Sequence, residues 1–152
     1  ASLLSTACRI GGLAGGLQRK NVESLTSFGH AYGMAFQIVD DILDVIATDD
    51  QLGKPAGNDL IEGVYTLPVL FALKLGSGHE LRELLGNELS VSERDQARDL
   101  IRSTDAVGMA LDRAQYWAHQ AGLELESLPS SPATQALFAA TSHLLEQVNS
   151  AG

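Results

Sequence analysis

The sequence predicts an all-α fold on the strength of two observations. No segment shows the sustained apolar–polar alternation of a half-buried strand, and apolar residues recur at helical spacing between Gly, Pro and Asn positions. The length of 152 residues suggests one domain. Apolar residues make up 45% of the chain and aromatic residues 5%, so the predicted core is aliphatic.

Two helices are predicted in the first third of the chain. Residues 3–17 are apolar and rich in small residues, and the glycines near their end predict a helix that packs closely and stops at Gly15 or Gly16. Asn21 is the expected N-cap of a second helix from about Val22 to Ile46. That helix would exceed the average length of about 11–12 residues.

A loop and five further helices are predicted after it. Residues 48–58 contain Asp, Gly and Pro at turn-forming positions and are expected to form a loop. Thr66 is a candidate cap, with Pro68 in the first turn, for a helix that ends at Gly76 or Gly78. The remaining expected helices are about 80–85, 92–103 (capped by Ser92 with Asp95), 105–126 and 133–148, with residues 149–152 frayed.

Acidic residues gather near the end of the long second helix, in the segment Phe36-Gln37-Ile38-Val39-Asp40-Asp41-Ile42-Leu43-Asp44. Successive residues of an α-helix are turned by about 100°. Gln37 and the three aspartates therefore share one stripe, and the remaining arc carries apolar side chains. The pattern predicts three carboxylates and one amide on a helix that is otherwise buried.

Two interpretations of this stripe are open: a solvated helix face and a cation site. Asp is a poor helix former, and no Lys or Arg lies within one turn of the stripe. Negative charge near the C-terminal end of a helix is also disfavoured by the helix dipole. A cation would offset these costs, and hard oxygen ligands suit Mg²⁺, which is shared with substrate phosphates. The spacing favours metal–phosphate binding over the solvated face; calcium or a partner's basic patch are further alternatives.

Other candidate functional residues are sparse. Lys54 lies between Gly53 and Gly57 in the predicted loop, where it can reach a metal-held diphosphate oxygen or simply be an exposed surface lysine. Cys8, the single cysteine, excludes an intramolecular disulfide, fits a reducing compartment and is expected to be a small core residue. The four histidines are scattered without metal-ligand spacing and are expected to be structural or surface residues.

Charge argues against a nucleic-acid partner, and hydropathy argues against a transmembrane segment. The net charge is −9 without a dense basic stretch, which argues against binding to nucleic acid phosphates. No apolar run reaches the about 20 residues of a membrane-spanning helix. We therefore expect a cytoplasmic protein with no nucleic-acid partner and no transmembrane segment.

Together, these motifs resemble the trans-isoprenyl (polyprenyl) diphosphate synthase family. The segment 33–44 is similar to the family's second aspartate-rich motif, F-Q-x-x-D-D-x-x-D. The residues from Gly53 to Pro68 are similar to the G-K-x-x-G-x-D-L…G…T-L-P stretch that follows it. A bare D-D-x-x-D is weak evidence, but its ordered neighbours make the signal specific. The resemblance covers residues 1–72 closely and the rest as a helical C-terminal region.

The resemblance implies a helical bundle of the isoprenoid synthase type and a prenyltransferase. The expected reaction condenses isopentenyl diphosphate with an allylic diphosphate by Mg²⁺-assisted ionisation, giving a trans-polyprenyl diphosphate. Of the three aspartates, Asp40 is the one that the resemblance favours as a direct metal ligand. The implied site residues are Asp40, Asp41 and Asp44 for Mg²⁺, Gln37 and Lys54 for the diphosphate, and Phe36 for the isopentenyl substrate.

Departures from the family pattern shape the expected domain organisation. The first aspartate-rich motif is absent, and the family's Lys-Thr pair would stand just before Ala1. Residues 1–152 are therefore expected to be the C-terminal part of a single isoprenoid synthase domain, and one motif alone is not expected to ionise the substrate. Val64 stands where many members carry a lysine, and Gln135 where a basic residue is common.

Two alternative functions belong to other classes. A non-catalytic partner subunit of a heteromeric synthase would keep the helical core, so a homodimer or a heteromer with a related subunit is expected. A class I terpene cyclase shares aspartate-rich helices, but the F-Q-x-x-D-D and G-K-x-x-G-x-D-L strings argue against it.

Overall fold

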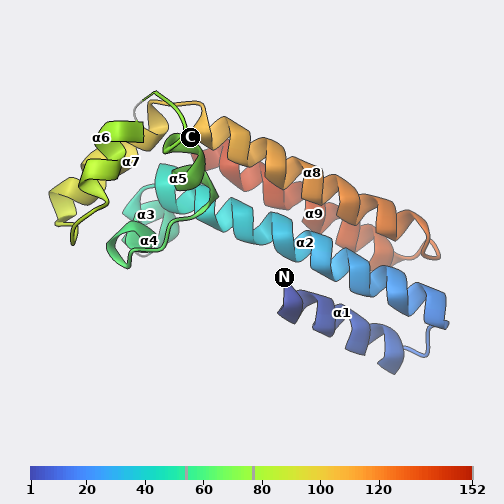
Figure 1. Cartoon of the computed structure of the whole chain (residues 1–152). Helices are drawn as coiled ribbons and strands as arrows, with labels where there is room; N and C mark the ends of the chain where they lie inside the picture. The colour runs from blue at the N-terminus through green and yellow to red at the C-terminus, as the bar shows by residue number, and fades with distance from the viewer. Residues whose placement is uncertain (54, 77, 152) are drawn as a thin grey trace. The chain divides into compact units, whose positions relative to one another are not determined.

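The prediction of an all-α fold is confirmed. The computed structural model describes residues 1–53, 55–76 and 78–151, and no strand occurs in those ranges. Their helices are α1 (Ser2–Ala14), α2 (Arg19–Ile46), α3 (Asp49–Leu52), α4 (Asn58–Ile61), α5 (Leu67–Ala72), α6 (Gly78–Leu84), α7 (Val91–Arg102), α8 (Ala106–Glu126) and α9 (Pro132–Ala151) (Figure 1). No helix in the described part of the chain is sufficiently long and apolar to cross a membrane.

The helices form two compact units. The first contains residues 1–39 and 113–147, and the second contains residues 40–112 and the last residues of the chain from Val148. Helices α2 and α8 contribute residues to both units. All three aspartates of the acidic segment belong to the second unit.

The first unit is held together by a core from four helices. Phe28 and Ala31 of α2 pack with Ala121 and Leu125 of α8, and residues of α1 and α9 cover them. Cys8 is half-buried against this cluster, as expected of a small packing residue, and burial raises the pKa of its thiol.

Helix α1 approaches α2 closely at two glycines of α2. A Cβ atom at Gly29 would lie 2.6 Å from the carbonyl oxygen of Leu4, and one at Gly33 would lie 2.6 Å from the Cα of Ala1. The glycine-rich end of α1 was expected to supply the close contact. A Cβ at Gly12 of α1 would lie 3.3 Å from the Leu25 side chain, which is a longer distance than at either glycine of α2. The tightest approach therefore comes from glycines of the long helix.

The second unit has its own aliphatic core. Val45 at the end of α2 packs with Leu60 of α4, Val69 of α5, Leu81 of α6 and Ile101 of α7. The segment after α4 is tied to this core, because the Tyr65 hydroxyl donates a hydrogen bond to the carbonyl of Leu85 at 2.7 Å. The end of α2 is thus packed into a unit built mostly from short helices.

Two predicted helix starts were wrong. Helix α2 begins at Arg19, because the carbonyl of Gln18 already accepts hydrogen bonds from the amides of Asn21 and Val22. Asn21 is therefore a buried residue within the helix and not its cap.

Helix α7 is capped by Ser90 and not by Ser92. Ser90 accepts a hydrogen bond from the backbone of Glu93, whose carboxylate accepts one from the backbone of Ser90. This reciprocal arrangement is a capping box, and it satisfies two backbone donors at once.

The predicted loop over residues 48–58 is partly helical. Thr48 and Gln51 form a second capping box that starts the single turn α3, and Gly53 ends it in the left-handed conformation (φ +66°). Helix α4 then begins at Asn58 after Gly57, which also has a positive φ (+73°). Lys54 lies outside the described residues.

Three helix ends also differ from the prediction. Helix α5 stops at Ala72, because i to i+3 hydrogen bonds from Lys74 and Leu75 tighten the chain into turns. Helix α6 starts at Gly78. Helix α9 continues to Ala151, so the described residues after Val148 are helical and not frayed.

Candidate functional site

The acidic stripe of α2 is not uniformly solvent-exposed. Gln37 and Asp40 are exposed, whereas Asp41 and Asp44 are 8% and 5% exposed. A solvated face would leave all three aspartates in water, so this interpretation does not describe the structure. Phe36 is about half exposed. Phe36 and Gln37 lie on helix α2, as the aspartates do, but they belong to the first unit of the chain.

The chain after α3 folds back onto Asp44. The Gly57 amide donates a hydrogen bond to the carbonyl oxygen of Asp44 at 2.8 Å, and the Asp59 amide donates one to its Oδ2 at 3.3 Å. A hydrogen bond also joins the two ends of this loop, because the Ala56 amide donates to Oδ1 of Asp49 at 2.8 Å. Two sequence segments that carry separate parts of the motif therefore meet at one aspartate.

Among the residues that the structure describes, the second carboxylate oxygen of Asp44 has no hydrogen-bond partner. Oδ1 is buried, although an unpaired buried polar atom is costly and calls for an explanation. Asp44 is thus a carboxylate with one oxygen bound to backbone and one that is buried without a partner among the described residues.

The donor set suits a cation that is shared with a ligand. Across the described residues, no three His, Cys, Asp or Glu side chains gather into a group that could hold a metal ion. Magnesium-type ions, however, are bound by one or two carboxylates together with water and substrate phosphates. Exposed Asp40 fits that mode of binding, and Asp44 lies four residues further along the same helix.

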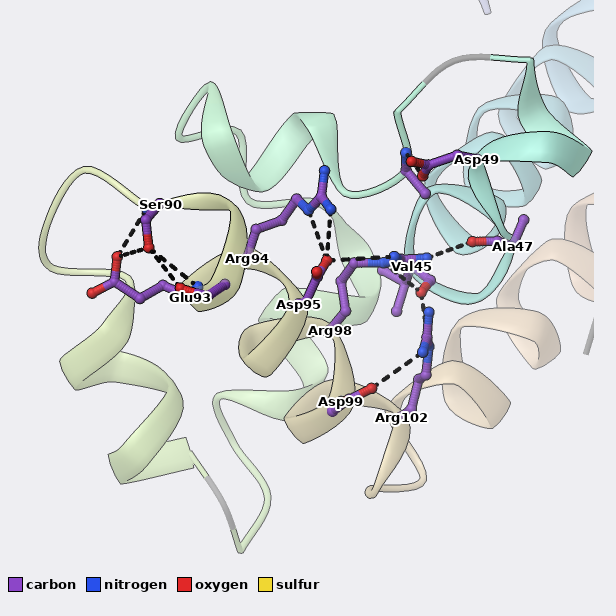
Figure 2. Close-up of polar contacts among 12 residues, drawn as sticks. Val45, Ala47, Asp49, Ser90, Glu93, Arg94, Asp95, Arg98, Asp99 and Arg102 are labelled. Atoms are coloured by element: carbon purple, nitrogen blue, oxygen red, sulfur yellow. Dashed lines mark hydrogen bonds and ion pairs between the residues drawn. The ribbon is translucent and has the colours of Figure 1, made fainter.

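Arginines of α7 hold the end of α2 (Figure 2). Arg98 donates hydrogen bonds to the carbonyl oxygens of Val45, at 3.0 Å, and Ala47, and Arg102 donates to the same Val45 oxygen at 3.0 Å. The last carbonyls of a helix lack intrahelical partners and carry partial negative charge. The two guanidinium groups therefore satisfy these carbonyls and offset the negative charge at this helix end.

Carboxylates on α7 accompany the arginines. Arg94 makes two hydrogen bonds to Oδ1 of Asp95, at 2.7 and 2.9 Å, and Arg102 pairs with Asp99 at 3.2 Å (Figure 2). Arg94 and Arg98 are both 8% exposed, which makes them buried charges. Buried charges of this kind are stable only when paired and hydrogen-bonded.

The acidic end of α2 is electrostatically coupled to Arg98. Burial lowers the pKa of the Arg98 guanidinium, the nearby Arg102 lowers it further, and Asp95 and Asp44 act in the opposite direction. An arginine stays protonated in spite of such a shift.

Sequence reasoning missed these arginines, although a signal for them existed. Arg94, Arg98 and Arg102 are spaced by four residues on one predicted helix, and like charges at this spacing repel each other. The structure offsets this repulsion with Asp95 and Asp99 on the same helix and with the Val45 carbonyl oxygen at the end of α2.

Comparison with known proteins gives consistent results. A family profile described as polyprenyl synthetase matches residues 1–102. The heptaprenyl diphosphate synthase component 2 of Bacillus subtilis is 34% identical over 144 residues, which are 95% of this chain and 41% of that protein. The nonaprenyl diphosphate synthase of Mycobacterium tuberculosis is 40% identical over 142 residues, covering 91% of this chain and 42% of that protein.

Solved structures agree with the sequence relatives. The geranylgeranyl pyrophosphate synthase from Corynebacterium glutamicum, complexed with calcium and isoprenyl diphosphate, is similar with a TM-score of 0.87 and 34% identity, over 97% of this chain and 46% of that chain. The polyprenyl synthase from Caulobacter crescentus, also complexed with calcium and isoprenyl diphosphate, has a TM-score of 0.86 and 31% identity, over 94% and 45% of the two chains. The present chain thus spans less than half the length of these proteins.

Proposed function

Because this chain belongs to the polyprenyl synthetase family, we propose that it is the diphosphate- and metal-binding part of a trans-polyprenyl diphosphate synthase. The proposed reaction joins an allylic diphosphate to isopentenyl diphosphate. The observation that carries the proposal is the backbone contact of Gly57 and Asp59 with Asp44, which joins the aspartate motif to the glycine-containing stretch behind it. Residues 1–152 would form the C-terminal part of one synthase domain.

The aspartates would have unequal roles at this site. Asp40 is exposed and would bind Mg²⁺ directly, together with oxygens of the allylic diphosphate. Asp44 would take part in holding the hydrated ion, while its Oδ2 stays bound to the backbone of Asp59. Asp41 follows Asp40 in the sequence and is buried. Its carboxylate would add negative charge that attracts the cation.

Three further residues would act on the substrates. Gln37 and Lys54 would contact the diphosphate, and Phe36, about half exposed, would lie near the isopentenyl substrate. When bound, Mg²⁺ supplies Lewis acidity that neutralises the departing diphosphate. The chain's residues would hold and orient that group, so no nucleophilic Ser, Cys or His is required.

An assembly of more than one subunit is part of the proposal. Two relatives, from Bacillus subtilis and Geobacillus stearothermophilus, are named component 2 of a heptaprenyl diphosphate synthase. We infer that this chain also works with a second polypeptide, either another copy or a related subunit. A non-catalytic partner role is the second candidate function.

A transplant experiment tests the catalytic role. Residues 1–152 replace the matching segment of the Mycobacterium tuberculosis relative, and prenyl transfer is measured with Mg²⁺, an allylic diphosphate and isopentenyl diphosphate. We expect product, and Asp40→Ala should lower turnover by about 10²–10³-fold without a loss of helix content. Asp50→Ala, which removes an exposed carboxylate of α3 outside the motif, is the matched control and should stay within about twofold.

Two results would count against the catalytic role. A folded transplant that makes no product favours the non-catalytic partner. Equal turnover of the Asp40→Ala and Asp50→Ala proteins would remove the metal role assigned to Asp40.

A further inference from the structure

Arg98 makes more contacts with the acidic end of α2 than the other arginines of α7. It donates to two carbonyl oxygens there, those of Val45 and Ala47, whereas Arg102 donates to that of Val45 alone. Arg98 is 8% exposed, while the side chain of Arg102 is 37% exposed. Figure 2 shows the Arg98 side chain directed at the last turn of α2.

The aliphatic stem of Arg98 also lies against the loop that returns to Asp44. A Cβ atom at Gly57 would be 2.7 Å from the Cδ of Arg98 and 3.0 Å from the Cδ of Arg94, so the Gly57 backbone rests on these stems. The same glycine donates its amide to the Asp44 carbonyl. One side chain therefore contacts both the helix that carries the motif and the loop that binds to it.

The arginines of α7 share a hollow with carboxylates and do not form an anion-binding surface. The hollow beside them, about 320 Å³, is lined by three guanidinium groups and by three carboxylates. Those carboxylates leave no excess positive charge for a phosphate in the hollow. The lining residues are Ala47, Thr48, Asp49, Arg94, Asp95, Arg98, Asp99 and Arg102.

We propose that Arg98 is a positioning residue for the acidic motif. Its guanidinium fixes the end of α2, and its stem supports Gly57, so that the amides of Gly57 and Asp59 remain hydrogen-bonded to Asp44. Asp44 is thereby held with its Oδ2 bound to the backbone of Asp59. The consequence for binding of a metal-held diphosphate rests on the proposed function.

Amide hydrogen exchange of the 152-residue chain tests the positioning directly. Arg98→Met should raise the exchange rates of the Gly57 and Asp59 amides by about tenfold. In the natural chain, local opening of this loop must break the contacts with Arg98, and in the variant it does not. Arg102→Met removes one bond to the same Val45 carbonyl and is the matched control; it should leave both amides within about twofold. Arg98→Lys keeps the charge without the forked donor geometry and should be intermediate, and it replaces Arg98→Met if the latter does not fold.

A second readout connects the geometry to binding. Calorimetric titration with Mg²⁺ and inorganic pyrophosphate should give an affinity about tenfold lower for Arg98→Met than for Arg102→Met. Unchanged exchange at Gly57 and Asp59, or an equal rise in the Arg102 variant, would overturn the positioning role. Faster exchange with unchanged affinity would overturn its link to binding. If the unsubstituted chain does not bind Mg²⁺–pyrophosphate, the proposed function is contradicted, and the exchange comparison still decides the role of Arg98.

Discussion

Replacing Gly57 with alanine should destabilise the second unit through two separate costs. Gly57 has φ +73°, and an alanine held there costs about 1–3 kcal/mol. Its Cβ would also lie 2.7 Å from the Cδ of Arg98, whose guanidinium is fixed by two carbonyl oxygens and cannot move freely. Overpacking of this kind adds about 1–3 kcal/mol. We expect a total loss of about 2–6 kcal/mol in the free energy of unfolding.

Gly63 offers a matched control for the first of these costs. Its φ is +72°, but a Cβ there would have no atom within 4 Å. Gly63→Ala therefore has the backbone cost without the clash. In urea unfolding followed by helical circular dichroism, Gly57→Ala should be less stable than Gly63→Ala by about 1–3 kcal/mol. Agreement of the two variants within about 0.5 kcal/mol would refute the packing of Gly57 on Arg98.

Two further predictions concern the first unit and helix α7. Gly29→Ala should lower the free energy of unfolding by about 1–2 kcal/mol net, because its Cβ would lie 2.6 Å from the Leu4 carbonyl oxygen. Gly11→Ala has no atom within 4 Å of its Cβ and should raise the free energy of unfolding by up to about 1 kcal/mol. Melting temperatures that shift in the same direction in both variants would contradict the close helix contact. Hydrogen bonds from Ser90 lower the pKa of Glu93 below its usual 4.5, so the stabilisation by the ionised carboxylate is present above that pH and is lost as pH falls through the lowered value. The melting temperature of the natural chain should exceed that of Glu93→Gln near neutral pH and converge with it in acid, and a constant gap would show that the charge is not involved.

Local sequence patterns were sufficient for the fold class and most helix positions. The glycines at positions 15 and 16 and the proline at 68 marked helix boundaries correctly, since their backbone preferences act within a few residues. Asn21 was misassigned because Gln18, with no capping signature, begins the helix hydrogen bonds. Thr48 and Gln51 have the spacing of a capping box, but the prediction assigned the whole segment to a loop from its turn-forming residues.

The candidate site was predictable only in part. The acidic residues on α2 were identified from helical spacing, but not that Asp41 and Asp44 are buried, because burial depends on segments far away in sequence. The contacts of Arg98 with Val45 and Ala47 join residues 51 to 53 positions apart. No local pattern fixes such a contact, although the spacing of the arginines could have suggested a partner of opposite charge.

We propose that the acidic end of α2 binds a diphosphate through a divalent cation, and calorimetric titration with an allylic diphosphate decides whether it does. Binding should require Mg²⁺, should be lost in Asp40→Ala and should be retained in Asp50→Ala. Binding that persists without the cation, or that is equally strong in the Asp40→Ala chain, would contradict it.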